Sequence, residues 1–93
     1  MSIRVTHIRL SGSVRDHEHI TDVRWISLED GDTGTSSVAT VVAWIEDKNG
    51  KAYVGSGANK VSVGVVRPQG RSPYLRTYAD RQWNNNLLSL DTF

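Results

Sequence analysis

The 93-residue chain has no cysteine and only two prolines. The lack of cysteine excludes disulfide bridges, thiolate metal sites and thiol nucleophiles. No stretch approaches the roughly 20 apolar residues that a membrane-spanning helix needs, and the first residues do not resemble a signal peptide. We therefore expect a protein of a reducing, aqueous compartment, the cytoplasm, that makes no contact with a membrane.

The chain also has little net charge, because 11 Lys and Arg residues face 10 Asp and Glu residues. A net charge of +1 argues against general nucleic-acid binding, which usually goes with a basic stripe and a pI above about 9. The charge is nevertheless uneven along the chain: residues 16–32 are acidic, whereas residues 1–15 and 60–93 are basic. This pattern fits weakly paired surface charges, or else an arginine-rich surface that meets an anion or an acidic partner.

Apolar and β-branched residues predict five strands and one helix. The predicted strands are residues 3–10, 19–26, 51–54, 60–66 and 74–79. A helix is predicted over residues 38–48, where valines and an isoleucine recur at helical spacing after three candidate N-cap residues. Asn49 and Gly50 end it, since both tolerate left-handed backbone. The acidic, glycine-containing stretch 27–34 is predicted to be a loop.

These elements predict a single α+β domain over residues 1–93. We expect a small antiparallel sheet of four to five strands, in the order strand-strand-helix-strand-strand-strand, packed on the one helix. The leucine-rich C-terminal tail, with Leu87, Leu88 and Leu90, is expected to close an open edge of the core.

All three histidines lie early in the chain, at His7, His17 and His19. Together with Glu18 they could bind zinc or nickel, which favour imidazole and carboxylate ligands. The spacing does not fix a third ligand, and His7 shares the parity of Val5, as a histidine packed in the core would. We therefore assign no metal and no cofactor, and keep a metal-dependent enzyme as an alternative.

The C-terminal third combines aromatic and arginine side chains. Three of them, Tyr74, Arg76 and Tyr78, share one face of the last predicted strand. The candidate binding residues are Arg71, Tyr74, Arg76, Tyr78, Arg81 and Trp83. Such a surface suits a protein partner, a phosphate or a stacked base, although tyrosines also pack at the rim of a core with their hydroxyls in water.

The same segment resembles a known family. The run from Tyr74 to Asp80, Tyr-Leu-Arg-Thr-Tyr-Ala-Asp, and the later Asn-Leu-Leu-Ser-Leu of residues 86–90 are similar to the C-terminal segment of the small bacterial and phage family catalogued as domain of unknown function 3892. The early His-Glu-His-Ile of residues 17–20 is similar to that family's His-Glu-x-Ile segment. The resemblance covers most of the chain and implies a fold but no reaction.

The chain departs from the family pattern at several positions. Asp91 and Phe93 stand where proline and cysteine are usual, and Trp25 replaces one of the glycines common after the second strand. Trp83 occupies a turn that is usually richer in glycine. These departures suggest a specialised surface around Trp25 and Trp83.

We therefore expect a small non-catalytic binding protein that engages a protein partner or a small anionic ligand, such as a nucleotide, through the arginine and aromatic surface. We also expect it to be a homo-oligomer. A phage-encoded form would inhibit a host defence system, either by binding one of its proteins or by sequestering its nucleotide signal. The alternatives are the metal-dependent enzyme and a structural or assembly component.

Overall fold

The computed structural model describes residues 2–55, 57–79 and 82–93, which form eight strands, one α-helix and two short 3-10 helices. The strands are β1 (Ser2–Leu10), β2 (Ile20–Ser27), β3 (Thr33–Ser37), β4 (Lys51–Val54), β5 (Val61–Val66), β6 (Tyr74–Ala79), β7 (Gln82–Asn84) and β8 (Asp91–Thr92). The helices are η1 (His17–His19), α1 (Val38–Lys48) and η2 (Gly57–Asn59).

Helix α1 has the bounds that its sequence predicts. The Ser37 hydroxyl accepts a hydrogen bond from the backbone N–H of Thr40 and so caps the first turn. Asn49 ends the helix in the left-handed conformation, with φ of 53°. The apolar stripe faces inward, since Val38, Val41 and Val42 are buried.

The strands pair in one mixed sheet with the order β3-β2-β1-β4-β5-β6-β7, and β8 pairs with β1 beside this path. Strand β1 is parallel to β4 and β8, whereas the other pairs are antiparallel. Residues 2–4 of β1 pair with β4, and His7 and Ile8 pair with β8. The register with β2 shifts between Val5 and His7, so a bulge lies between the residues that pair with β4 and those that pair with β8.

The prediction of a small antiparallel sheet with four to five strands is wrong. The described residues form eight strands, and their sheet is mixed. The parallel pairing arises from a crossover. Helix α1 carries the chain from β3 to the far side of β1, where β4 then runs beside β1 in the same direction. Strand β3 overlaps the end of the stretch that was predicted to be a loop. The sequence of β3, Thr-Gly-Thr-Ser-Ser, has no apolar alternation and therefore did not predict a strand.

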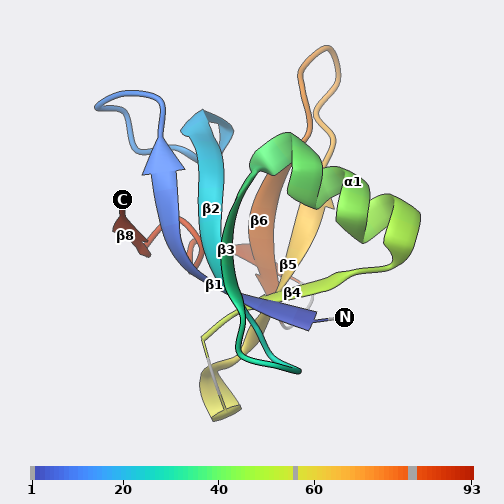
Figure 1. The fold of residues 1–93 in the computed structure, drawn as a ribbon. Helices are drawn as coiled ribbons and strands as arrows, with labels where there is room; N and C mark the ends of the chain where they lie inside the picture. Colours follow the sequence, from blue (N-terminus) through green and yellow to red (C-terminus); the bar gives the residue numbers. More distant parts are fainter. Residues whose placement is uncertain (1, 56, 80–81) are drawn as a thin grey trace.

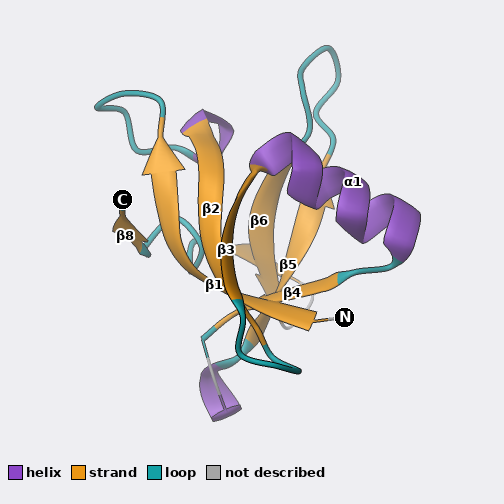
Figure 2. Cartoon of the chain, viewed as in Figure 1, coloured by secondary structure: helices purple, strands orange, loops and turns teal. Residues whose placement is uncertain are grey.

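The sheet curls so that its two ends approach each other. Strands β3 and β6 are separated by four strands in the sheet, yet α1 contacts both of them. Figure 1 shows α1 lying across the side between β3 and β6, and Figure 2 shows the strands wrapping around behind it. Helix α1 thus closes the gap that the curled sheet leaves open.

The core fills the inside of this curl. Strands β1, β2, β4, β5 and β6 and helix α1 all contribute buried apolar side chains to one cluster. Leu87 comes from the C-terminal segment and is also fully buried, and Leu88 and Leu90 pack against the cluster. Among the described residues, no helix has the length and the apolar character needed to cross a membrane.

Candidate functional site

Strand β6 places the predicted arginine and aromatic residues on one of its faces. Leu75 and Thr77 point to the opposite face and are buried, whereas Tyr74 and Arg76 are half-buried and Tyr78 is exposed. Tyr78 lies four residue steps along the strand from Tyr74, a distance of about 13 Å. The face is therefore long enough to hold two separate sites.

The Tyr78 end of this face carries a pair of exposed rings. Tyr78 and Trp83 are directly opposite each other on β6 and β7, and their ring centroids lie 5.1 Å apart in an edge-to-face arrangement. The side chains remain open to solvent, with 39% of Tyr78 and 43% of Trp83 exposed. The Trp83 ring also lies over Gly64 of β5, where a Cβ would stand 3.1 Å from the indole. The rings of Tyr78 and Trp83 are referred to below as the aromatic surface.

Arg76 lies beside the aromatic surface, but its guanidinium is already engaged. Its Nε donates to the backbone carbonyl of Asn84 at 3.1 Å, and its Nη2 donates to Oδ1 of Asn85 at 3.1 Å. Arg76 therefore fixes the segment that follows Trp83. Arg81 lies outside the described residues.

Arg71 and Tyr74 belong to a second place, at the other end of β6. The Nη1 atom of Arg71 donates to both carboxylate oxygens of Glu18, at 2.8 and 3.1 Å. These side chains and Tyr74 line a cavity of about 490 Å³ that also reaches Val38 and Ala39 in the first turn of α1. The structure thus divides the predicted surface between an aromatic end and a charged cavity.

The three histidines occupy different environments. Nδ1 of His7 lies 2.9 Å from the Thr6 hydroxyl, and Nδ1 of His19 lies 3.2 Å from the Ser11 hydroxyl. His17 is 7% exposed and packs beside Tyr74. Within the part of the chain that the structure describes, no three His, Asp or Glu side chains gather as a metal site.

Burial lowers the pKa of His17, because the charged imidazolium loses hydration there. The positive charge of Arg76 lowers it further, while the carboxylate of Asp16 acts in the opposite direction. Among the described residues, the buried Nε2 atom of His17 has no hydrogen-bond partner. The surroundings of His17 therefore favour its neutral form over the charged one.

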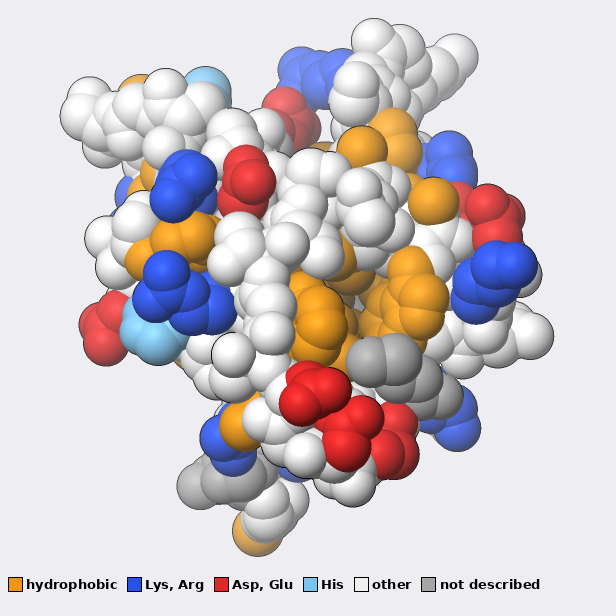
Figure 3. Space-filling model, in the orientation of Figure 1, with side chains coloured by type: hydrophobic (Ala, Val, Ile, Leu, Met, Phe, Trp, Pro, Cys, Tyr) orange, Lys and Arg blue, Asp and Glu red, His pale blue; other side chains and the backbone are white. Residues whose placement is uncertain are grey.

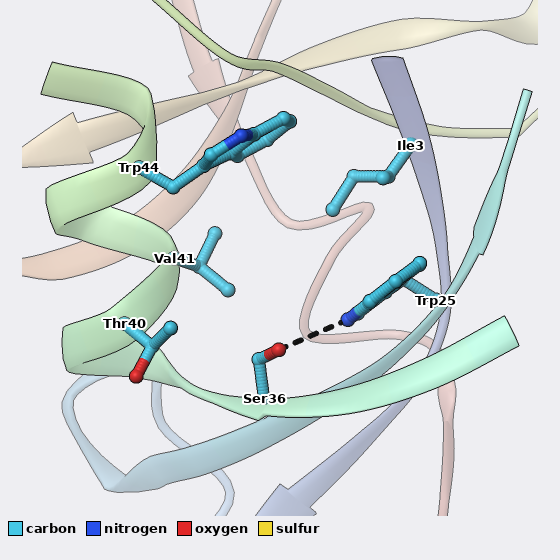
Figure 4. Close-up of a pocket in the computed structure, with 6 residues that line it drawn as sticks. All are labelled: Ile3, Trp25, Ser36, Thr40, Val41 and Trp44. Atoms are coloured by element: carbon cyan, nitrogen blue, oxygen red, sulfur yellow. Dashed lines mark hydrogen bonds between the residues drawn. The ribbon is translucent and has the colours of Figure 1, made fainter. Parts of the chain in front are cut away.

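A cavity that the sequence analysis did not predict lies between α1 and strands β1 to β3. It has a volume of about 220 Å³ and is lined by Ile3, Trp25, Ser36, Thr40, Val41 and Trp44. Figure 4 shows Trp25 of β2 and Trp44 of α1 on either side of it, with Ile3 and Val41 between them. The indole Nε1–H of Trp25 donates to the Ser36 hydroxyl at 3.1 Å, which holds the ring against β3.

Two glycines make room for these indoles. A Cβ at Gly34 would stand 2.5 Å from the Trp25 ring, and a Cβ at Gly50 would stand 2.3 Å from the Trp44 ring. Both distances are shorter than a real side chain permits. In the sequence, these glycines predicted only a loop and the end of a helix, and Trp25 was noted as a departure from the family pattern. Neither observation predicted that Trp44 lies opposite Trp25.

Residues 4–91 match the model of the family described as protein of unknown function, DUF3892. The chain belongs to this family. The resemblance seen in the C-terminal Tyr-Leu-Arg-Thr segment is thereby confirmed. No curated protein and no solved structure matches the chain. The chain departs from the DUF3892 pattern at two tryptophans: Trp25 lines the cavity opposite Trp44, and Trp83 forms the aromatic surface with Tyr78.

Proposed function

We propose that this member of DUF3892 is a binding protein that engages a protein partner through the aromatic surface of Tyr78 and Trp83. The observation that supports the proposal most directly is that the two rings are assembled against each other while both stay exposed. Large aromatic side chains are enriched among the residues that dominate protein–protein binding energy. An aromatic pair at the surface is therefore suited to act as an anchor.

The aromatic surface is also held in place before any partner arrives. Trp83 is in edge contact with Tyr78 and lies over Gly64, and Arg76 fixes the segment that follows Trp83. A side chain that is already ordered loses less conformational entropy on binding, at about 0.5–1.5 kcal/mol per immobilised side chain. In this proposal Arg76 is a positioning residue and the two rings make the contact.

The test compares Trp83→Ala with a matched control, Val14→Ala. Val14 is also an exposed apolar side chain, 57% open to solvent, but it lies in the segment between β1 and η1. We expect the tagged wild-type protein and Val14→Ala to retain the same partner, and Trp83→Ala to lose it. With the purified partner, Trp83→Ala should weaken binding by about thirtyfold, the effect of about 2 kcal/mol at a hot spot.

If the partner binds Trp83→Ala and Tyr78→Ala as tightly as it binds the wild type, the aromatic surface is not the contact. Sedimentation of the protein alone distinguishes the kind of partner. Self-association that disappears in Trp83→Ala identifies a second copy of the chain, in line with the expected homo-oligomer. For a phage-encoded protein, we propose that the partner is a host defence protein in the cytoplasm and that binding inhibits it.

An anionic ligand is the second candidate, and the cavity beside Arg71 favours it. Its volume of about 490 Å³ falls within the range of about 300–1,000 Å³ of small-molecule sites. The guanidinium of Arg71 and the first turn of α1 both border it, and helix N-termini attract anions. Glu18 opposes this, since it already pairs with Arg71 and would have to be displaced.

Titration with adenosine monophosphate separates the two candidates. Arg71→Ala should abolish nucleotide binding if the cavity is the site, and Glu18→Gln should strengthen it by releasing the guanidinium. Arg67→Ala is the matched control, because Arg67 is also an exposed arginine in an ion pair, with Glu46. Equal nucleotide binding by wild type, Arg71→Ala and Glu18→Gln rejects this candidate.

A further inference from the structure

The Trp25–Trp44 cavity is of a size that fits one side chain. Its volume of about 220 Å³ is below the range of about 300–1,000 Å³ typical of sites that enclose a whole small molecule. It exceeds the engineered apolar cavity of about 150 Å³ that accepts benzene. An aromatic ring or a branched apolar side chain therefore fits the available space.

The lining of the cavity offers few free hydrogen-bonding groups. The Ser36 hydroxyl already accepts from the indole of Trp25. The Thr40 hydroxyl lies 2.8 Å from that of Ser37, in the cap of α1. The other lining side chains are Ile3, Val41 and the two indoles, so the lining is mainly apolar and favours the entry of an apolar group over a polar one that would lose hydrogen bonds with water.

An acidic turn adjoins this cavity. Glu29, Asp30 and Asp32 are exposed in the connection between β2 and β3. Figure 3 shows acidic side chains directly beside hydrophobic ones near the centre of this face. The order of the chain agrees, because Asp32 lies two residues before Gly34, which is paired with Trp25.

One side-chain hydrogen bond ties the acidic turn to β1, which contributes Ile3 to the cavity lining. Oε1 of Glu29 accepts from the backbone N–H of Ser2 at 2.6 Å, and Ser2 precedes the lining residue Ile3. Asp30 accepts from the backbone N–H of Asp32 at 3.0 Å, which lowers the pKa of Asp30 and keeps it ionised. Lys51 lies opposite Ser2 on β4, but within the described part of the chain none of the three carboxylates is in an ion pair. The local field therefore remains negative.

We propose that the Trp25–Trp44 cavity binds an apolar side chain that a partner protein presents beside lysine or arginine residues. The side chain fills the space between the two indoles, and the neighbouring cations face Glu29, Asp30 and Asp32. Indole rings also attract cations through their faces, so a basic neighbour is favoured at the mouth of the cavity as well. This interaction is separate from the aromatic surface of Tyr78 and Trp83.

The probes that test the proposal are three capped tripeptides: Lys-Phe-Lys, Glu-Phe-Glu and Lys-Ala-Lys. The readout is the indole N–H signals of the three tryptophans in an ¹H–¹⁵N NMR spectrum. We expect Lys-Phe-Lys to shift the signals of Trp25 and Trp44 and to leave that of Trp83 unchanged. Binding of so short a peptide is expected near a Kd of about 1 mM, with Glu-Phe-Glu and Lys-Ala-Lys each about tenfold weaker.

Salt and charge variants test the electrostatic part. The preference for Lys-Phe-Lys over Glu-Phe-Glu should shrink at about 1 M salt, where the Debye length is about 3 Å. The triple variant Glu29→Gln, Asp30→Asn, Asp32→Asn should remove the preference while the phenylalanine still binds. Asp47→Asn, which removes an exposed charge from α1, should leave the preference unchanged.

A steric variant tests the cavity itself. Thr40→Leu places a larger side chain in the lining and should abolish the peptide-induced shifts. Ala43→Leu adds a comparable side chain at an exposed position of α1 outside the lining and should preserve them. Equal binding of Lys-Phe-Lys and Glu-Phe-Glu overturns the proposal, and so does the absence of shifts at Trp25 and Trp44 up to about 10 mM peptide. Shifts confined to Trp83 also overturn it.

Discussion

The indole of Trp25 lies so close over Gly34 that a Cβ at this glycine would stand 2.5 Å from Cζ2 of the ring. We predict that Gly34→Ala forces the ring away and lowers the free energy of unfolding by about 1–3 kcal/mol, the usual effect of overpacking. The hydrogen bond from Trp25 to Ser36 should break at the same time. Urea denaturation measures the first effect, and the indole N–H signal of Trp25 reports the second.

Gly12→Ala is the control for this substitution. A Cβ at Gly12 has nothing within 4 Å, and its φ lies outside the left-handed region. The alanine there should change the free energy of unfolding by no more than about 0.5 kcal/mol. Equal effects of Gly34→Ala and Gly12→Ala would show that the contact between Trp25 and β3 does not hold in solution.

Thr77 joins β6 to the C-terminal segment through a buried hydroxyl. The side chain is 0% exposed, its Oγ1 lies within hydrogen-bonding reach of both oxygens of Asn84, and it accepts from the backbone N–H of Leu87 at 3.3 Å. Thr77→Val keeps the shape but leaves the Leu87 N–H buried without a partner. We expect a loss of about 1–3 kcal/mol in the free energy of unfolding, measured by urea denaturation.

Thr21→Val provides the comparison for Thr77, since the Thr21 hydroxyl is exposed and donates to the Arg9 carbonyl at 3.4 Å. Water can replace that bond, so the change should stay within about 0.5 kcal/mol. A Thr77→Val variant as stable as Thr21→Val would mean that the C-terminal segment does not depend on this hydroxyl.

Asn49 ends α1 with φ of 53°, a conformation that glycine adopts freely and alanine does not. Asn49→Ala is expected to lower the free energy of unfolding by up to about 1–2 kcal/mol, because alanine keeps the Cβ but lacks the short polar side chain that lets asparagine hydrogen-bond locally in left-handed backbone. Asn49→Gly should be close to neutral. Thermal denaturation of Asn49→Ala and Asn49→Gly tests this prediction, and equal melting temperatures of the two variants would contradict a left-handed Asn49.

Local patterns explain why α1 could be predicted and β3 could not. The bounds of α1 follow from an apolar stripe, a serine cap and the Asn-Gly pair, all of which lie within or beside the helix. Strand β3 has no such pattern and is ordered by pairing with β2, where Trp25 lies opposite Gly34. The parallel pairing of β1 with β4 depends on contacts between distant residues, which no short window of sequence contains.

The candidate site could likewise be predicted from the sequence only where the pattern is local. Alternation along β6 correctly placed Tyr74, Arg76 and Tyr78 on one face. Alternation did not reveal that Arg71 pairs with Glu18, 53 residues away, or that Trp44 faces Trp25 across a cavity. Both relationships arise from the curl of the sheet and the position of α1 across it.

His17 makes the stability depend on pH in a defined direction. Its folded pKa lies below the ordinary value of 6.5, chiefly because of burial. As the pH falls below about 6.5, the unfolded chain takes up a proton at this residue before the folded protein does, so the free energy of unfolding decreases. The decrease from this group stops once the pH has passed below the folded pKa, where both states are protonated.

Thermal denaturation between about pH 7.5 and pH 5 measures this dependence against His17→Gln, which removes the titrating group. The melting temperature of the wild type should fall more steeply with decreasing pH than that of His17→Gln. His19→Gln is the matched control, because His19 is an exposed histidine on the same turn, and it should retain the steep wild-type dependence. Parallel curves for wild type and His17→Gln would contradict a buried neutral imidazole, since protonating His17 would then cost the folded state nothing.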